Sequence, residues 1–521
     1  MIPLVQIAKL APPTPLSFET TFARLKEAVL ARRPVFREIL LQHGAKSLFQ
    51  YIADYTATEL SAPRADRQDE LIAVFKDEVA RRLGPEVAAS AGAQLKRYYY
   101  ASTTDHYGPI SHPWVLNFNL VTQAAYMENP DPDLRNIITL ACANVSLNNF
   151  SFPRGLSFTG MDRERRLKTH RLSFLPSNAH SHAVYNFRPY TGSEIHKVIK
   201  LLTSKVRDGA MQPTQAEKLA QLLEEIYCRP DVLGLPSYAE QITKTSYELW
   251  KKLSAPGQAK DVNFVYIDQE WLVSRLLMEH HLSQDTFLNR LIFDPSSEAR
   301  LIKHFESLPE SFMRMTRRGT YLFWLQRAGE LRTGLWKEGN ALVSEDGTVR
   351  IELTPEAIRS GLESKELIPS VLLTFITLCF YYGLKCLGGL GQVNYLPRLK
   401  EAFIRMCMEE NDVESALACS SVYTKDLGGE VTVAFLDGPF GQFVPATTMD
   451  LLVHGVPDLW SRIAEESKRI TLSEALSPMI PEDYPVVYPK AERESELAAI
   501  KPADVVCMTG LNRKIEPCAE V

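Results

Sequence analysis

Apolar residues in the first hundred positions recur with the spacing of amphipathic helices. Within residues 66–83 the apolar positions fall three and four apart, at Leu71, Ile72, Val74, Phe75 and Val79. This period predicts a helix with one buried face. The same spacing predicts helices at 18–30 and 34–48, and it returns between residues 193 and 253. Both regions are expected to form a helical scaffold.

A different pattern indicates strands. Asn136 to Ala143 (NIITLACA) and Asn263 to Ile267 (NFVYI) are rich in β-branched residues and carry no charge, which predicts buried strands. Short apolar runs between 320 and 351 are expected to pair as antiparallel strands. Strands separated by helices over 114–190 indicate an α/β unit. The expected fold is mixed α/β and helix-rich: an α/β core flanked by helical segments, with an α+β region toward the C-terminus.

The expected organisation has five segments. They are an N-terminal helical segment (1–95), an α/β core (96–190), a helical region with one strand (191–310), an α+β region with a buried helix (311–490) and a C-terminal tail (491–521). The last forty residues carry prolines and charges and are expected to be loosely structured. The stretch 368–384 is uncharged, at the lower limit of length for crossing a bilayer. Its proline, serine and tyrosines favour a helix buried inside the protein.

Composition limits the classes of partner. The net charge is −5 and the pI is about 6.2, so no basic surface for nucleic acid is expected. None of the eight cysteines forms a CxxC pair, which indicates reduced thiols and a cytoplasmic protein. The expected partner is a small-molecule substrate, with no nucleic acid and no membrane.

The stretch 105–113 (DHYGPISHP) is the first candidate site. Gly108-Pro109 and Pro113 oppose a helix, so the polar groups Asp105, His106 and His112 are expected on a loop. A second histidine pair, His180 and His182, stands two residues apart, which places both rings on one side of an extended chain.

Carboxylate oxygen and imidazole nitrogen suit zinc, manganese or iron. The sequence therefore predicts a divalent metal held by Asp105, His112, His180 and His182, with His106 and Asp105 as catalytic groups. The alternative is that these histidines only form hydrogen bonds, since His-x-His pairs also arise by chance.

Other polar residues are candidates for substrate binding. Arg154 is expected to orient an anionic substrate, and Asn149 lies in the same loop region. Gln392 and Tyr395 follow a glycine-rich stretch, 388–391. Because this stretch follows a predicted buried helix, it does not match the strand–turn–helix context of a dinucleotide-binding motif, and a tight turn is expected there.

Three stretches, in order, resemble the creatininase family of metal-dependent amidohydrolases. They are Asp105-His106-Tyr107-Gly108-Pro109, Phe152-Pro153-Arg154-Gly155 and Asn178-Ala179-His180-Ser181-His182. The resemblance implies metal ligation by Asp105, His180 and His182. The chain departs from the family at Tyr107, which stands where the family has its second ligand, and the family's bridging aspartate is absent.

The leading functional hypothesis is a cytoplasmic metal-dependent hydrolase that cleaves an amide, or performs a related carbonyl-centred reaction, on a small polar metabolite. One alternative is a metal-free transferase or lyase in which His106 or His112 acts as acid or base and Asp105 orients it. The other is a non-enzymatic small-molecule-binding or scaffold protein.

Overall fold

The computed structural model describes residues 17–56, 65–110, 112–129, 131–179, 181–255, 261–308, 319–439, 442–455, 458–515 and 519–520. Helices and strands alternate through this part of the chain, and helix predominates. The mixed, helix-rich α/β fold expected from the sequence is confirmed.

The N-terminal helices agree with the hydrophobic pattern. They are α1 (Phe18–Arg32), α2 (Pro34–His43), α3 (Leu48–Thr56), α4 (Ala65–Leu83) and α5 (Pro85–Tyr98). The Ser17 hydroxyl caps α1 by accepting a hydrogen bond from the backbone N–H of Thr20. In α4 the apolar positions at threes and fours, Leu71 and Phe75 among them, are buried.

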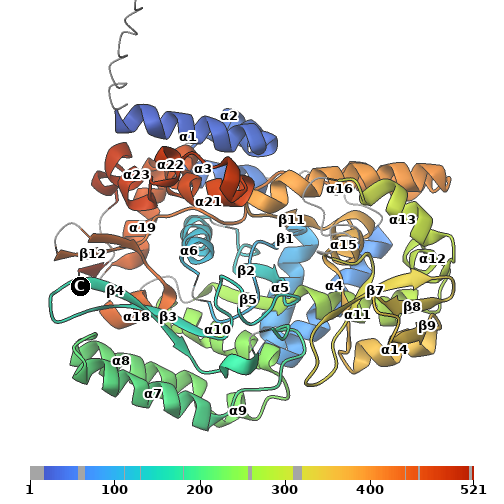
Figure 1. Ribbon diagram of the computed structural model, residues 1–521, viewed down its shortest axis with the longest axis horizontal. Helices are drawn as coiled ribbons and strands as arrows, with labels where there is room; N and C mark the ends of the chain where they lie inside the picture. The colour runs from blue at the N-terminus through green and yellow to red at the C-terminus, as the bar shows by residue number, and fades with distance from the viewer. Residues whose placement is uncertain are drawn as a thin grey trace, which may run out of the picture.

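A parallel sheet of four strands lies at the centre (Figure 1). Its order is β11 (Lys385–Leu387), β1 (Tyr100–Ser102), β2 (Asn136–Ala141) and β5 (Asn263–Asp268). The chain runs outward from β1 to β2 and β5 and then returns to add β11 on the other side of β1. The strand order therefore reverses between β1 and β11. In open parallel sheets a crevice forms at such a reversal, beyond the carboxyl ends of the strands.

Helices cover both faces of this sheet, and alternate strand residues enter two separate cores. Ile137 and Phe264 belong to the core beneath α6 (Pro113–Glu128) and α10 (Tyr238–Ser254), where Trp250 stacks on Phe264. Ile138 and Val265 belong to the core beneath α4, α5 and α11 (Gln269–Leu276). Figure 1 shows α6 and α4 on opposite sides of the sheet. Apolar strand residues predominate because neither face meets water, and the buried charges Lys385 and Asp268 are paired with Asp426 and Arg82.

The segment 114–121 is helical and belongs to α6. Pro113 occupies the first turn of α6, where its missing N–H costs no hydrogen bond.

The antiparallel strands expected between 320 and 351 are confirmed. They form the order β10 (Leu367–Pro369), β6 (Phe323–Leu325), β7 (Thr333–Glu338), β8 (Ala341–Ser344) and β9 (Arg350–Glu352). Helix α14 (Pro355–Glu363) follows, and the Thr354 hydroxyl accepts from Ala357 N as its N-cap. The hairpin β3 (Gly155–Met161) and β4 (Leu167–Ser173) stands apart from this sheet.

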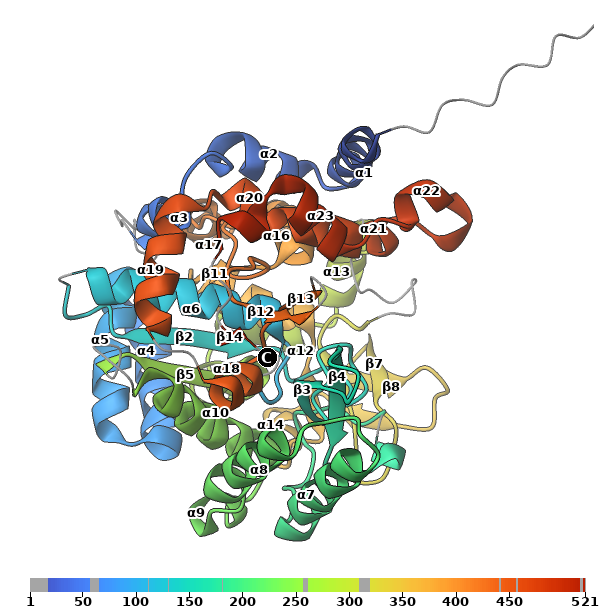
Figure 2. The ribbon, with the colours of Figure 1, turned by 90° about the vertical axis from the view of Figure 1, so that its left-hand side faces the viewer.

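The helices of 193–253 are also confirmed. α7 (Gly192–Arg207) and α8 (Pro213–Leu222) pack as a hairpin, and a π-helical segment, η2 (Leu223–Tyr227), continues α8 (Figure 1). The remaining elements named in Figures 1 and 2 are α9 (Pro230–Leu233), α12 (Phe287–Phe293), α13 (Ser297–Phe305), α16 (Leu390–Glu409), α17 (Val413–Ser420), α18 (Thr448–His454), β12 (Phe435–Gly438), β13 (Gln442–Pro445) and β14 (Ala519–Glu520).

The uncharged stretch near 371–384 is the buried helix expected from its composition. It begins as α15 (Val371–Phe375) and continues as the π-helical segment η6 (Ile376–Tyr381). All but one of its residues are buried. Over the described ranges, no helix combines the length and the apolar character needed to cross a membrane.

The expectation that the last forty residues are loosely structured is wrong. This region contains α21 (Ile480–Val487), α22 (Ser495–Ala498) and α23 (Pro502–Thr509), preceded by α19 (Leu459–Arg469) and α20 (Leu472–Leu476). In Figures 1 and 2 the red helices α21, α22 and α23 lie against blue α1. Leu497 and Val505 are buried, whereas Val486 of α21 is 69% exposed. Short helices with so few apolar positions give little periodic signal, and packing on α1 stabilises them.

Candidate active site

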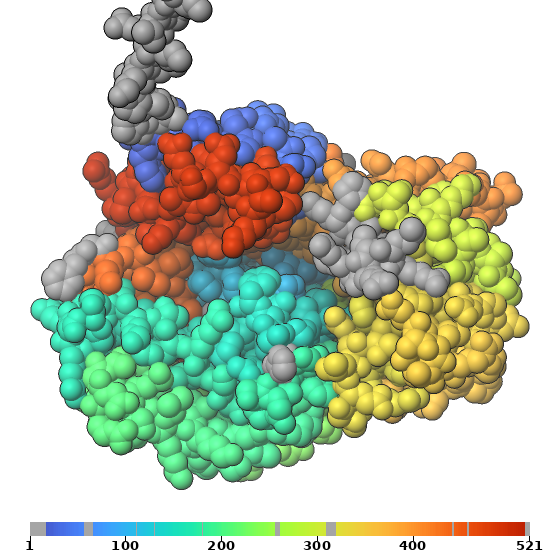
Figure 3. Space-filling model, viewed as in Figure 1, coloured from blue at the N-terminus to red at the C-terminus, as the bar shows by residue number. Residues whose placement is uncertain are grey.

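A cavity of about 1120 Å³ lies at the carboxyl edge of the parallel sheet. Residues one or two positions after β1, β2, β5 and β11 line it, namely Thr103, Cys142, Gln269 and Gly389. Figure 3 shows a recess between the red C-terminal helices and the teal segment below them. The cavity therefore occupies the crevice expected where the strand order reverses.

The end of β1 delivers Asp105 and His106 to this cavity. Beyond the regular strands, Cys142 N donates to Asp105 O (2.9 Å) and Tyr107 N donates to Cys142 O (2.8 Å), so β1 and β2 remain paired here. Asp105 is buried, and the Tyr266 hydroxyl donates to its Oδ2 at 2.7 Å. Burial raises the pKa of Asp105 to about 7, although the hydrogen bond from Tyr266 opposes this shift. The carboxyl group can therefore exchange a proton near neutral pH.

His106 is held in one tautomer by Asn149. The His106 Nδ1 atom lies 2.8 Å from Asn149 Oδ1, and this same oxygen accepts from Ser151 N (3.1 Å) and Ser151 Oγ (3.0 Å). Since the amide oxygen can only accept, Nδ1 of His106 carries the proton and Nε2 keeps its lone pair. Burial lowers the pKa of His106, which keeps the ring neutral. Such an imidazole can act as a general base.

His112 lies beside His106 at the mouth of the cavity. The ring of Phe150 contacts both histidines edge-on, with centroid distances of 5.2 Å to His106 and 5.5 Å to His112. Burial lowers the pKa of His112 to about 4, and repulsion from His106, when His106 is protonated, and from Arg171 acts in the same direction. The side chain of Phe150 is itself exposed, so an aromatic edge shields the two rings from water.

The end of β2 contributes a thiol, and the start of α11 contributes a carboxyl group, that the sequence analysis missed. Cys142 Sγ donates to Glu270 Oε1 (3.2 Å), and Ala143 N donates to Glu270 Oε2 (2.8 Å). Burial raises the pKa of Glu270 to about 7, and burial also raises the pKa of Cys142. The thiol is therefore protonated, and it is not an activated nucleophile.

Arg332 places a positive charge on the cavity wall. Its guanidinium donates to the backbone oxygen and the side-chain oxygen of Asn144 and lies over the Trp324 ring, 4.3 Å from the centroid. Over the ranges described above, no carboxylate forms an ion pair with Arg332. The cavity also contains the Arg33 guanidinium, but Arg33 is bound by Asp483. Arg332 is thus a cation available to an anionic ligand.

The glycine-rich stretch follows a strand, so the expectation that it follows a helix directly is wrong. The strand β11 stands between the buried helix and the glycines, and its three residues are too few to show a strand pattern in the sequence. Helix α16 begins after the glycines, at Leu390. Leu390 N donates to Glu430 Oε2 (2.5 Å), and Gln392 Nε2 donates to Thr103 Oγ1 (2.7 Å). A Cβ atom on Gly389 would lie 2.9 Å from Glu430 Oε1, so glycine permits this close approach. Gly388 forms a β-bridge to Leu427 and Gly389 is the N-cap of α16, so the backbone approaches its neighbours closely here, as expected.

Six of the predicted site residues line the cavity: Asp105, His106, His112, Asn149, Gln392 and Tyr395. Arg154 and His182 are not among the lining residues. Arg154 lies near Ser173 Oγ (3.4 Å from its Nη2), and His182 Nδ1 lies 3.2 Å from Gln326 Nε2. His180 lies outside the described residues. Cys142, Glu270, Arg332 and Glu430 carry no local motif, and only the fold brings them together.

The predicted metal ligands do not assemble around one ion in the part of the chain that the structure covers. In that part of the chain, one group of three ligand-type side chains has its ligand atoms within 4.8 Å of one another. This group consists of His196, Glu224 and Cys228. Asp105, His112 and His182 form no such group. The four-ligand set, with His180, stays a prediction, and we derive no chemical step through a metal in the cavity.

No protein-family model matches the chain, and no curated protein matches its sequence.

Proposed function

We propose that the protein is an enzyme that acts on a small anionic metabolite bound in the cavity, with His106 as general base. The observation that carries this proposal is the hydrogen bond from His106 Nδ1 to Asn149, which leaves Nε2 unprotonated. Fixing a neutral imidazole in one tautomer is how enzymes orient a catalytic base.

The reaction we propose is hydrolysis of an amide or a related carbonyl-centred step. His106 Nε2 takes a proton from water while the water oxygen bonds to the carbonyl carbon. As the bond from carbon to nitrogen breaks, the leaving nitrogen takes a proton from Asp105. The pKa of Asp105, about 7, suits that role because a fraction of the carboxyl groups is protonated at neutral pH. Proton return from His106 to Asp105 through solvent completes the cycle.

Arg332 supports an anionic substrate. Its guanidinium presents several N–H donors in a plane, and those not used by Asn144 can bind a carboxylate or phosphate. Arg171 also lines the cavity, on the side near His112, and adds positive potential. These two arginines take the place that the sequence analysis gave to Arg154.

The metal-dependent version stays a second candidate. Asp105, His106 and His112 line one cavity and supply an oxygen and two imidazole nitrogens, ligand types that suit zinc, manganese or iron. Their ligand atoms do not all lie within 4.8 Å of one another, so these side chains would have to move to bind one ion. It predicts that exhaustive chelation abolishes turnover, whereas the metal-free mechanism predicts full activity after chelation.

The test begins with thermal shift against a panel of small carboxylates, phosphates and N-acyl amino acids. We expect anionic compounds to raise the Tm of the wild type, because a ligand that binds only the folded state stabilises it. R332M should lose this shift. R154M is the matched control and should keep the Tm shift. If R154M loses the shift and R332M keeps it, the assignment of Arg154 from the sequence is right.

Turnover of each stabilising compound is then followed. H106Q should lower kcat by roughly 10²–10⁴-fold, the range for loss of a general base, and H182Q should leave kcat within a factor of two or so. Equal activity of H106Q and wild type would refute the proposal. Binding without turnover of any compound would favour the non-enzymatic binding protein.

A further inference from the structure

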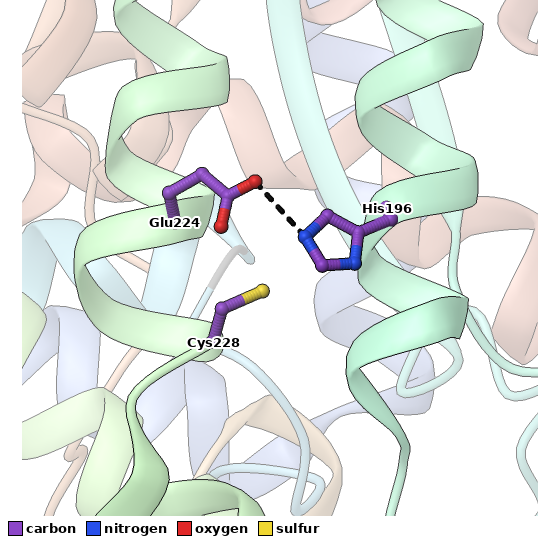
Figure 4. A group of neighbouring side chains, drawn as sticks. All are labelled: His196, Glu224 and Cys228. Atoms are coloured by element: carbon purple, nitrogen blue, oxygen red, sulfur yellow. Dashed lines mark ion pairs between the residues drawn. The ribbon is translucent and has the colours of Figure 1, made fainter.

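Three ligand-type side chains converge on the outer surface of the helical hairpin of α7 and α8. His196 comes from α7, and Glu224 and Cys228 come from η2 and the residue that ends it. Figure 4 shows the imidazole, the carboxylate and the thiol pointing into the space between the two helices. His196 Nε2 lies 3.1 Å from Glu224 Oε1, and one ligand atom of each residue lies within 4.8 Å of the others. None of the three lines the cavity.

We propose that His196, Glu224 and Cys228 form a zinc site that joins α7 to η2. The proposal does not depend on the function proposed for the cavity. The site is built on α7 and η2 alone, and none of its three residues lines the cavity.

The donor set has the chemistry of zinc. Zn²⁺ binds thiolate sulfur at about 2.3 Å and imidazole nitrogen or carboxylate oxygen at about 2.0–2.2 Å. Ligand atoms at those distances around one ion are separated by roughly 3–4 Å in a tetrahedron. The spacing within 4.8 Å fits this with side-chain rotation alone. Magnesium and calcium prefer sets made only of oxygen, so they are expected to bind weakly here.

The exposure of the three residues leaves room for a fourth ligand. The side chains of His196 and Glu224 are half exposed, at 54% and 49%, while Cys228 is partly buried. Three protein ligands with an open position occupied by water is a recurrent zinc arrangement. On binding, the Cys228 thiol loses its proton to solvent as the zinc–sulfur bond forms, with no change of oxidation state.

The local backbone supplies a reason for the arrangement. Glu224 and Cys228 stand four residues apart across a π-helical segment. π-Helical turns are rare in proteins, and those that occur are often found at functional sites. His196 faces them from the neighbouring helix. A metal here would join two helices that the chain already places side by side, and it would stabilise the hairpin without reorganising it.

The test uses the full-length, untagged protein, freed of metal with chelator and then titrated with Co²⁺ and Zn²⁺. We expect one equivalent of cobalt and a thiolate-to-cobalt charge-transfer band that zinc abolishes and excess magnesium does not. C228S should lose the band, and H196A should weaken zinc binding at least tenfold. C507S removes an exposed thiol elsewhere and is the matched control that should keep the band.

Thermal unfolding of the metal-free proteins separates a lost site from a lost fold. Without metal, H196A and E224Q should unfold at nearly the same Tm as the metal-free wild type. Added zinc should raise the Tm of the wild type but not that of the two variants. Unchanged zinc affinity in H196A and C228S would overturn the proposal. So would a wild type that gives no charge-transfer band in excess cobalt.

Discussion

Asp105 illustrates how burial changes the chemistry of a single side chain. In water its pKa would be 3.8, but inside the cavity wall it is about 7. Between these two values the folded protein holds a proton that the unfolded chain releases. The resulting stabilisation is fully present below about pH 4 and is lost as the pH rises through about 7. Stability therefore falls with increasing pH because of this residue.

This sign gives the prediction for D105N. Between about pH 5 and about pH 8 the free energy of unfolding should fall less in D105N than in the wild type, since the amide cannot ionise. Urea unfolding at both pH values measures the difference. D69N, which changes an exposed aspartate, should behave as the wild type does. Identical pH dependence in D105N and wild type would show that Asp105 does not take up a proton on folding.

His106 makes a complementary point at the same scale. The lone histidine is ambiguous in the sequence, because either ring nitrogen could carry the proton. The position of Asn149, forty-three residues later, decides the tautomer. The chemical role of a residue is thus set by a neighbour that no local pattern connects to it.

At the scale of elements, the turn between β11 and α16 connects the sheet to the cavity. Its glycines differ in their surroundings. A Cβ on Gly389 would meet Glu430 Oε1 at 2.9 Å and Thr104 Cγ2 at 3.3 Å, whereas a Cβ on Gly391 would meet no described atom within 4 Å. Glu430 in turn accepts the hydrogen bond from Leu390 N at the start of the helix.

These surroundings predict opposite effects of the same substitution. G389A should destabilise the protein by about 1–3 kcal/mol, because overpacking displaces the Glu430 carboxylate. G391A lies in the first turn of α16 and should be neutral or stabilise by about 0.4–1 kcal/mol, since alanine restricts the unfolded chain. Urea unfolding of the pair tests this. Equal stability of the two variants would contradict the close approach at Gly389.

At the scale of the whole molecule, the two ends of the chain close one side of the cavity together. Arg33, between α1 and α2, binds Asp483 of α21 in two parallel contacts, Nε to Oδ2 at 3.1 Å and Nη2 to Oδ1 at 3.2 Å. Both side chains are buried, and both line the cavity. On the outside, Arg24 and Glu494 connect the same two regions, with side chains that are 41% and 57% exposed.

The two ion pairs should differ in their contribution to stability. D483A should cost roughly 3–5 kcal/mol, because it leaves the buried Arg33 without that carboxylate. E494A should cost no more than about 1 kcal/mol, since water screens the outer pair. Chemical unfolding measures both, and the double variant R33A/D483A should lose less than the sum of the single variants. Similar costs for D483A and E494A would show that the inner pair is not desolvated.

Much of the fold could be predicted because its signals are local. The period of three and four in α4 and the uncharged runs of β2 and β5 each extend over several neighbouring residues. β1 and β11 could not be resolved in the same way. Each has three buried residues and continues directly from or into a helix or glycine turn, so neither shows an alternation. Without β11, the glycine turn was assigned the wrong context.

Part of the candidate site could also be predicted, because its residues lie close together in the sequence. Asp105, His106 and His112 stand together in nine residues, and Gly108-Pro109 marks that stretch as a loop. Arg332 and Glu430 reach the cavity from segments more than two hundred residues away. No spacing in the sequence links them to Asp105.

The sequence by itself determined the helices with a repeating apolar face, the main uncharged strands and a polar loop at 105–113. Propensity, caps and turn residues act between near neighbours, so they can be read along the chain. Only the tertiary structure decided the order of the sheet, the place where it reverses, and hence which side chains share the cavity. It also decided which carboxyl groups titrate near neutrality, because desolvation depends on every segment packed around a group.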